Sequence, residues 1–192
     1  MAKKQDFQPD KLGAGFFSHL YLTKKQRRSL LKWSLYGIVL LILSLLQDVV
    51  LCRMRINGAT TELIPCAIIL ITLVEGAESG CVFSLSAALC YLFSGSSPGI
   101  YTMVLIPFLA IGAAVFRQSY LQKGFGAALF CCGVAFALYE ACVFLLGLFL
   151  GLTYTARYIG FLTTWGLTLP AIPALYPIVL SIGKIGGETW KE

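Results

Sequence analysis

Glu140 is the residue best placed to do chemistry, because it stands inside a long apolar run, Ala135–Phe144. A carboxylate within lipid is costly unless it is paired or hydrogen-bonded. A transporter would use such a group to carry a proton or a cation. A scaffold would use it to hydrogen-bond a neighbouring helix, with Tyr139 or a serine as partner. No other acid forms a relay with Glu140 in the sequence, so we favour the packing or partner contact.

Other polar residues mark the ends of apolar segments. Gln47 and Asp48 close the first segment, a few residues before Arg53 and Arg55. We interpret this group as an interfacial cap with local ion pairing. Glu62 stands where the next apolar run begins, and the helix dipole favours an acidic residue at a helix start. These positions therefore need no functional explanation.

Several signatures of catalysis and of cofactor binding are missing from the sequence. There is no Walker A motif, no HExxH and no CxxC pair, and His19 is the one histidine. The seven cysteines stand mostly inside apolar runs, where a free thiol packs as a small hydrophobic group. We therefore expect a non-enzyme with no catalytic residues, no metal, no cofactor and no nucleic-acid partner.

The amino-acid composition indicates the solvent that surrounds these polar residues. The chain has 192 residues, of which 58% are hydrophobic and 12% charged, and its mean hydropathy is +0.81. A soluble domain is about 25% charged, so this chain has too little polar sequence to cover a surface in water. Its solvent should be lipid.

The apolar sequence divides into six segments, which predict an all-α integral membrane protein with about six transmembrane helices. Its single membrane domain covers residues 30–185, between a basic tail (1–29) and a short C-terminal tail (186–192). Prolines 170, 173 and 177 predict that the last segment is kinked or broken. The second and third segments are short for a membrane crossing. In order, the segments are about Leu30–Val50, Thr61–Val74, Ala77–Phe93, Ile100–Phe116, Gly126–Leu150 and Tyr158–Ile185.

A six-residue stretch with the sequence SGSSPG separates the third and fourth segments. Glycine allows positive φ and proline fixes its own φ, so this composition predicts a tight turn between two helices. Its residues Ser94, Gly95, Pro98 and Gly99 join Gln47 and Glu140 as our candidate packing or partner contacts.

Glycines of the fifth segment suggest close helix packing. Gly147 and Gly151 form a GxxxG pair, a spacing that lets two helix backbones approach each other in a membrane. The match is weak in a chain with 19 glycines, and tight packing explains it better than a ligand site.

Basic residues predict the orientation. With the N-terminus and an even number of spans on the cytoplasmic side, 12 of the 15 Lys and Arg residues fall on that side. The N-terminal region contributes most of them, and Arg53, Arg55 and Arg157 are the three outside. Cytoplasmic loops carry an excess of Lys and Arg, so both termini should be cytoplasmic. Glu75 and Glu78 would then face the cytoplasm as well.

Taken in order, several segments resemble the rod shape-determining protein MreD family. A first span ending in Leu45-Leu46-Gln47 is followed by Glu62-Leu63-Ile64-Pro65 and by a glycine-bounded turn at Glu75–Gly80. The strongest similarity is Ala88–Tyr101, a small-residue helix that ends in the SGSSPG turn. Glu140 stands where the family often has an acid. The resemblance covers about residues 33–185.

Two features depart from that family's pattern. Cys90 stands where the family frequently has Asp, which removes any polar contact made through that position. The basic N-terminal extension is also longer than usual for the family.

The resemblance implies a non-catalytic subunit of the bacterial cell-elongation complex, placed in the plasma membrane and regulating peptidoglycan synthesis and cell shape. Its implied partners are MreC, actin-like MreB filaments, and RodA with its class B penicillin-binding protein. It also implies a fold similar to the S components of energy-coupling-factor transporters.

That fold similarity supplies the alternative, a vitamin-binding S component. Such a protein should gather several polar or aromatic groups around an outward cavity. The sequence offers Glu140, Tyr139, Asn57 and Trp165, which are scattered along the chain. A proton-coupled transporter would need more intramembrane acids than Glu140 alone.

Overall fold

The computed structural model describes residues 24–53, 59–121 and 124–185, and its main elements are helices. Arg55, Asn57, Lys123 and the predicted C-terminal tail lie outside these ranges. Most of the predicted N-terminal tail, residues 1–23, also lies outside them. The α-helices are α1 (Lys24–Leu45), α2 (Leu63–Glu75), α3 (Ala77–Phe93), α4 (Thr102–Tyr120), α5 (Phe125–Phe149), α6 (Tyr158–Thr168) and α7 (Ala171–Ile185). Short helical turns are η2 (Leu46–Val50, a π-helix), η3 (Leu51–Arg53) and η4 (Thr155–Arg157).

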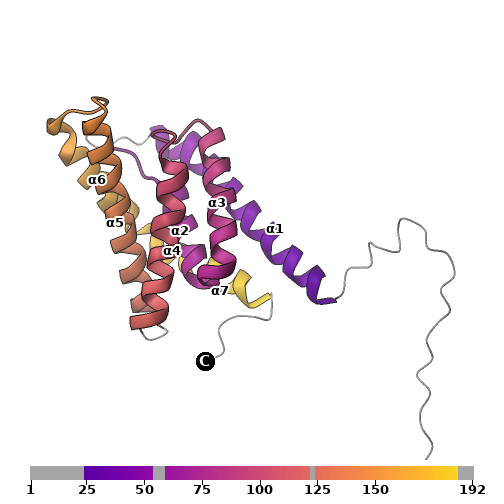
Figure 1. Cartoon of the computed structure of the whole chain (residues 1–192). Helices are drawn as coiled ribbons and strands as arrows, with labels where there is room; N and C mark the ends of the chain where they lie inside the picture. The colour runs from indigo at the N-terminus through magenta and orange to yellow at the C-terminus, as the bar shows by residue number, and fades with distance from the viewer. Residues whose placement is uncertain (1–23, 54–58, 122–123, 186–192) are drawn as a thin grey trace, which may run out of the picture.

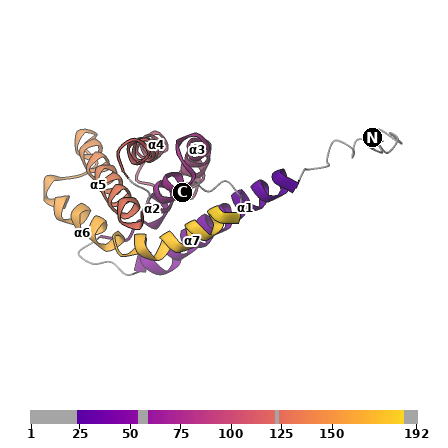
Figure 2. The same cartoon turned by 90° about the horizontal axis from the view of Figure 1, so that it is seen from below.

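Helix α2 is the centre of the molecule. Seen from below, it lies between a row formed by α3, α4 and α5 and a second row formed by α6, α7 and α1 (Figure 2). It contacts α1, α3, α4, α5 and α7. Helix α1 leans away from the bundle along one side (Figure 1).

The sequence of α2 explains its central place. Its residues are apolar apart from Thr72 and the final Glu75, and those from Leu63 to Val74 are all buried. Thr72 satisfies its hydroxyl by donating to the Ile68 carbonyl oxygen at 2.8 Å. A helix that is apolar all round belongs in a core. At about 1.5 Å per residue it is too short to cross a ~30 Å hydrocarbon layer unaided.

The turn from α2 to α3 brings those two helices into close contact. Gly76 ends α2 with φ +93°, a conformation that costs glycine little. Gly80, one turn into α3, packs directly on Thr72: a Cβ added at Gly80 would lie 2.6 Å from Thr72 Cγ2. The absence of a side chain at Gly80 therefore sets the spacing between α2 and α3.

Three helical stretches of the described chain are long and apolar enough to cross a membrane. They are Gln26–Arg53, Thr102–Tyr120 and Phe125–Phe149, and a fourth span is formed if α6 and α7 count as one bent crossing. The predicted all-helical class is confirmed. The count of six stays a prediction, since α2 and α3 are shorter apolar helices of 13 and 17 residues.

The predicted break in the last apolar segment is present. Helix α6 ends at Thr168, α7 begins at Ala171, and the two axes are bent by 45°. Pro170 stands in the gap between them, where a proline interrupts a helix. Pro177, by contrast, lies within α7.

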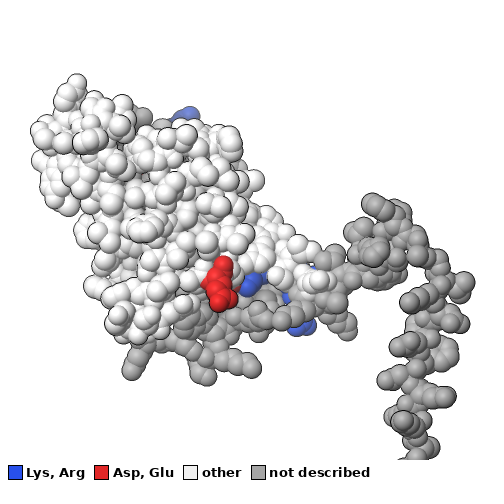
Figure 3. Space-filling model, viewed as in Figure 1, with Lys and Arg blue, Asp and Glu red and all other residues white. Residues whose placement is uncertain are grey.

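The surface matches the apolar composition. One broad face is free of charge through its middle, with charged side chains at its lower end and a single basic side chain visible at the top (Figure 3). Large apolar residues are exposed at both ends and between them, including Phe93 at 84%, Phe108 at 73% and Phe149 at 88%. Such a surface is compatible with a lipid solvent.

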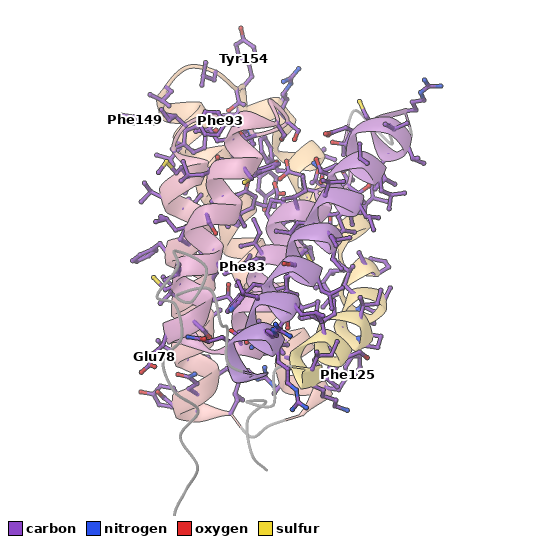
Figure 4. All side chains as sticks on the ribbon, turned by 90° about the vertical axis from the view of Figure 1, so that its right-hand side faces the viewer. Glu78, Phe83, Phe93, Phe125, Phe149 and Tyr154 are labelled. Atoms are coloured by element: carbon purple, nitrogen blue, oxygen red, sulfur yellow. The ribbon has the colours of Figure 1, made fainter. Side chains whose placement is uncertain are left out.

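The two ends of the bundle differ in charge. Helix α1 begins at Lys24, inside the predicted tail, and carries Arg27, Arg28 and Lys32 into the bundle. Arg117 near the end of α4 and Lys184 near the end of α7 are basic residues in last helical turns. We call this the basic end. The opposite end is the loop end, where Phe93, Phe149 and Tyr154 lie far from Glu78 and Phe125 (Figure 4).

The GxxxG pair of α5 has a different role from the one predicted. Gly151 has φ +69° and follows the helix end at Phe149. The Leu152 N–H donates to the Gly147 carbonyl oxygen at 2.8 Å. The two glycines therefore terminate α5 and do not pack two helices together.

Candidate functional site

A buried ion pair lies at the basic end. Lys32 Nζ of α1 is 2.6 Å from Glu75 Oε2 of α2, and the two side chains are 9% and 6% exposed. The Tyr36 hydroxyl donates to Glu75 Oε1 at 2.7 Å and lies 3.2 Å from the Val179 carbonyl oxygen of α7. Glu75 was predicted to face the cytoplasm, and instead its side chain joins α1 to α2 beside α7.

Gln47 caps the first turn of α2. Its Oε1 accepts hydrogen bonds from the Leu63 N–H at 2.8 Å and the Ile64 N–H at 3.2 Å. The first N–H groups of a helix have no partner within the helix, and here a buried side chain from η2, which directly follows α1, supplies one. Gln47 is thus an internal packing contact. Asp48 beside it accepts a hydrogen bond from Ser44 at 3.3 Å.

Three buried polar groups remain without hydrogen bonds close to this cap. They are Glu62 Oε2, the Tyr139 hydroxyl and Glu140 Oε1. Glu62 immediately precedes α2, and its backbone N–H donates to Thr168 Oγ1 at 3.2 Å. Glu140 is only 4% exposed and Tyr139 is fully buried. The two carboxyl groups interact electrostatically, and among the described residues neither has an ion-pair partner.

Tyrosines surround this pair of acids. Tyr91 of α3 and Tyr101 at the start of α4 lie within electrostatic range of Glu62, as does Tyr139. Burial raises the pKa of the Glu62 carboxyl to about 7, and the Tyr139 hydroxyl opposes that shift. We call Glu62, Glu140, Tyr91, Tyr101 and Tyr139 the acid–tyrosine cluster.

The SGSSPG loop closes the cluster at the loop end. Gly95 has φ +75°, which confirms the predicted tight turn. The Tyr91 hydroxyl donates to the Ser96 carbonyl oxygen at 3.3 Å, so the loop is held on a member of the cluster. Gly99 lies against Tyr101, where an added Cβ would be 2.5 Å from Cε1 of the ring.

Ser94 and Pro98 complete the loop. The Ser94 hydroxyl donates to the Tyr91 carbonyl oxygen at 2.8 Å and lies 2.7 Å from the Ser96 hydroxyl. Pro98 stands in the bend before α4, and its fixed φ suits that position. Four of the six predicted contacts, Ser94, Gly95, Pro98 and Gly99, therefore belong to one loop, beside the cluster that contains Glu140.

Residues 95–99 of this loop also match the letters of the GxSxG nucleophile motif. That motif works in a strand–turn–helix elbow with a histidine as base. Here the stretch joins two helices, and His19 lies outside the described residues. The geometry is that of a turn and supplies no activated nucleophile.

An apolar groove of about 800 Å³ lies between α1 and α3, which touch where the ring centroids of Trp33 and Phe83 are 5.4 Å apart. Many of the residues that line the groove have small side chains. These are Gly37, Ser44, Ser79, Ser86, Ala87, Cys90 and Ser94. Only 17% of the apolar window of the first candidate span is buried inside the protein. The cysteines were predicted to be buried, and Cys66, Cys131 and Cys132 are. Cys81 and Cys90 differ, because they are exposed on α3.

Sequence reasoning missed part of this arrangement. It identified Glu140, Gln47 and the loop, and it placed Glu62 at a helix start without its burial beside Glu140. Tyr91 and Tyr101 were not singled out. Their signal was present, because two tyrosines flank the SGSSPG turn and a tyrosine hydroxyl in an apolar segment requires a partner.

Comparison with known proteins gives no match: no family model, no curated protein and no solved structure is significantly similar to the chain. The function is therefore argued from the chain's own residues and geometry.

Proposed function

We propose that this chain is a non-catalytic membrane subunit of the bacterial cell-elongation complex, of the MreD type, and that it acts through helix–helix contacts. The observation that carries the proposal is the groove between α1 and α3. The order of the motifs from Gln47 to Glu140, and above all Ala88–Tyr101, supports the family assignment.

The groove suits a transmembrane helix as its occupant. In lipid the hydrophobic effect does not drive helices together, so association depends on close packing and interhelical hydrogen bonds. Gly37, Ala87 and Cys90 allow a backbone to come near, and Ser44 and Ser86 offer hydroxyl groups. The remaining walls are mostly large apolar or aromatic side chains: Trp33, Leu40, Leu41, Leu45, Ile64, Val82, Phe83 and Tyr91. MreC is the partner that the resemblance implies.

The basic end supports the proposed orientation. Arg27, Arg28 and Lys184 lie at the end of the bundle that we assign to the cytoplasm, and Arg117 donates to the Leu73 carbonyl oxygen there at 3.0 Å. Basic residues near a membrane surface favour the cytoplasmic side. This face would meet MreB, while RodA and its penicillin-binding protein would contact the helices within the bilayer.

Site-specific photo-crosslinking in bacterial cells tests the proposal. A photoreactive residue at Val82, which lines the groove and is 72% exposed, should give an adduct with MreC. The matched control is Val104, which is 70% exposed on α4 and lines no groove found in the described chain. Adducts at Val104 but not at Val82, or adducts with neither MreC nor the synthases, would refute it.

The acid–tyrosine cluster favours a second candidate, the S component of an energy-coupling-factor vitamin transporter. A solute site contains a few convergent polar groups in an apolar surrounding, and the cluster has that character. In that case Val82 adducts would form with a transmembrane coupling subunit, and purification of the chain would recover paired ATPases.

A further inference from the structure

The acid–tyrosine cluster contains two acids with buried oxygen atoms that the proposed scaffold function does not use. Glu62 and Glu140 each keep a buried carboxylate oxygen without a hydrogen bond. Among the described residues, the one buried ion pair is Lys32–Glu75, which lies at the other end of α2. Buried acids of this kind need a cation, a proton or a donor group.

Several of the protein's own donors near the cluster are committed to other acceptors. The first N–H groups of α2 point toward Gln47 Oε1, and the Glu62 N–H donates to Thr168. The Tyr91 hydroxyl donates to the loop carbonyl of Ser96. The Tyr139 hydroxyl is fully buried; among the described residues it has no well-formed hydrogen bond, and it lies close enough to Glu62 to act as its donor. A group that enters the cluster can therefore bind two carboxylate oxygens and one phenol oxygen.

The chemistry of the walls identifies the class of ligand. A divalent metal such as Ca²⁺ takes about 6–8 oxygen ligands, and the described part of the chain has no group of three or more His, Cys, Asp or Glu side chains that could hold a metal ion. Aromatic rings beside carboxylates are instead the surroundings in which proteins bind organic ammonium ions, through cation–π attraction and charge. Tyr91, Tyr101 and Tyr139 provide three such rings within electrostatic range of Glu62.

We propose that the acid–tyrosine cluster is a binding site for a primary ammonium group, held by Glu62, Glu140 and the Tyr139 hydroxyl and enclosed by Tyr91 and Tyr101. Three N–H donors of a primary ammonium match the three free oxygen atoms. The SGSSPG loop lies over the site because Tyr91 is bonded to Ser96 and Gly99 packs on Tyr101. The ligand enters from the loop end, as a free small amine or as the headgroup of phosphatidylethanolamine.

Thermal unfolding of the full chain in lipid nanodiscs tests this proposal. In phosphatidylcholine nanodiscs at neutral pH, saturating ethanolamine should raise Tm by about 5 °C over the same concentration of choline or sodium chloride. If the ligand is a lipid headgroup, phosphatidylethanolamine nanodiscs give the rise and free ethanolamine does not. Either result supports the site and identifies the source.

Two variants show whether the rise comes from this cluster. Glu62→Gln combined with Glu140→Gln keeps the side-chain shapes and should abolish the shift, and Tyr139→Phe should weaken it. Glu78→Gln, an exposed acid at the other end of the bundle, is the control and should leave the shift unchanged. Equal shifts with choline or sodium, a shift retained in the double variant, or no shift with either amine source would overturn the proposal.

Discussion

Replacing Lys32 by methionine removes the positive partner of a carboxylate that stays in the protein interior. Methionine fills most of the volume of the lysine stem, so the main change is the lost charge. Glu75 keeps one hydrogen bond, from Tyr36 at 2.7 Å, while the ammonium contact at 2.6 Å is lost. The two side chains are 9% and 6% exposed, so water cannot replace the lost partner.

The expected cost is that of an uncompensated buried charge, about 3–5 kcal/mol. For a chain of this size, about 2–4 °C of Tm corresponds to 1 kcal/mol, so Tm should fall by roughly 6–20 °C. The assay is thermal unfolding of the purified protein in detergent, followed by the fluorescence of Trp33, which packs against Tyr36 with ring centroids 5.8 Å apart.

The second half of the experiment removes both charges. In the Lys32→Met, Glu75→Gln variant the amide can still accept from Tyr36, and no buried charge is left. Replacing a buried ion pair in this way is often neutral or stabilising, so most of the loss in Tm should be recovered. Arg28→Met, an exposed position on the same helix, is the control. The reasoning fails if Lys32→Met costs no more than Arg28→Met, or if the double variant is as unstable as the single one.

Three further predictions concern the same helix α2. Gln47→Met removes the acceptor of two buried N–H groups and should cost about 1–3 kcal/mol per group left unpaired, measured as a fall in Tm. Gly80→Ala places a Cβ 2.6 Å from Thr72 Cγ2 and should cost about 1–3 kcal/mol, whereas Gly112→Ala, with open space around it, should be neutral or stabilising. Because the folded state raises the pKa of Glu62 from 4.5 to about 7, it binds the proton more tightly than the unfolded chain between those values. Tm should therefore fall as pH rises from 5 to 8. The Glu62→Gln, Glu140→Gln double variant, which removes both interacting carboxyl groups, should flatten that dependence; a rise of wild-type Tm over the same range would contradict it.

Helix positions could be predicted because in this chain they depend mainly on where apolar runs begin and end. The second segment was expected at Thr61–Val74 and the helix is Leu63–Glu75; the third coincides with α3 at Ala77–Phe93. Proline and glycine acted locally as expected, at the break before α7 and at Gly95. Local chemistry of this kind does not depend on which helices become neighbours.

Contacts between helices could not be predicted in the same way. Lys32 and Glu75 are 43 positions apart, and their meeting depends on how α1 and α2 are rotated about their axes. A polar face normally indicates that rotation, but the helices of this chain are apolar nearly all round. The same reason hid the approach of Glu62 to Glu140, and it left the role of Gln47 as a cap on α2 undetected.

The buried polar contacts explain how α1 can be fixed while a groove stays open beside it. Apolar packing alone gives helices in lipid little preference for one arrangement, so position depends on groups that must find partners. Helix α1 and the turn η2 that continues it are held to α2 at two places. Lys32 of α1 pairs with Glu75 at the basic end, and Gln47 of η2 accepts from the first N–H groups of α2 at the loop end. Neither contact needs the side of α1 that faces α3. A partner helix can therefore enter the groove without breaking a polar contact, and an adduct at Val82 should form in a protein whose Lys32–Glu75 pair remains intact.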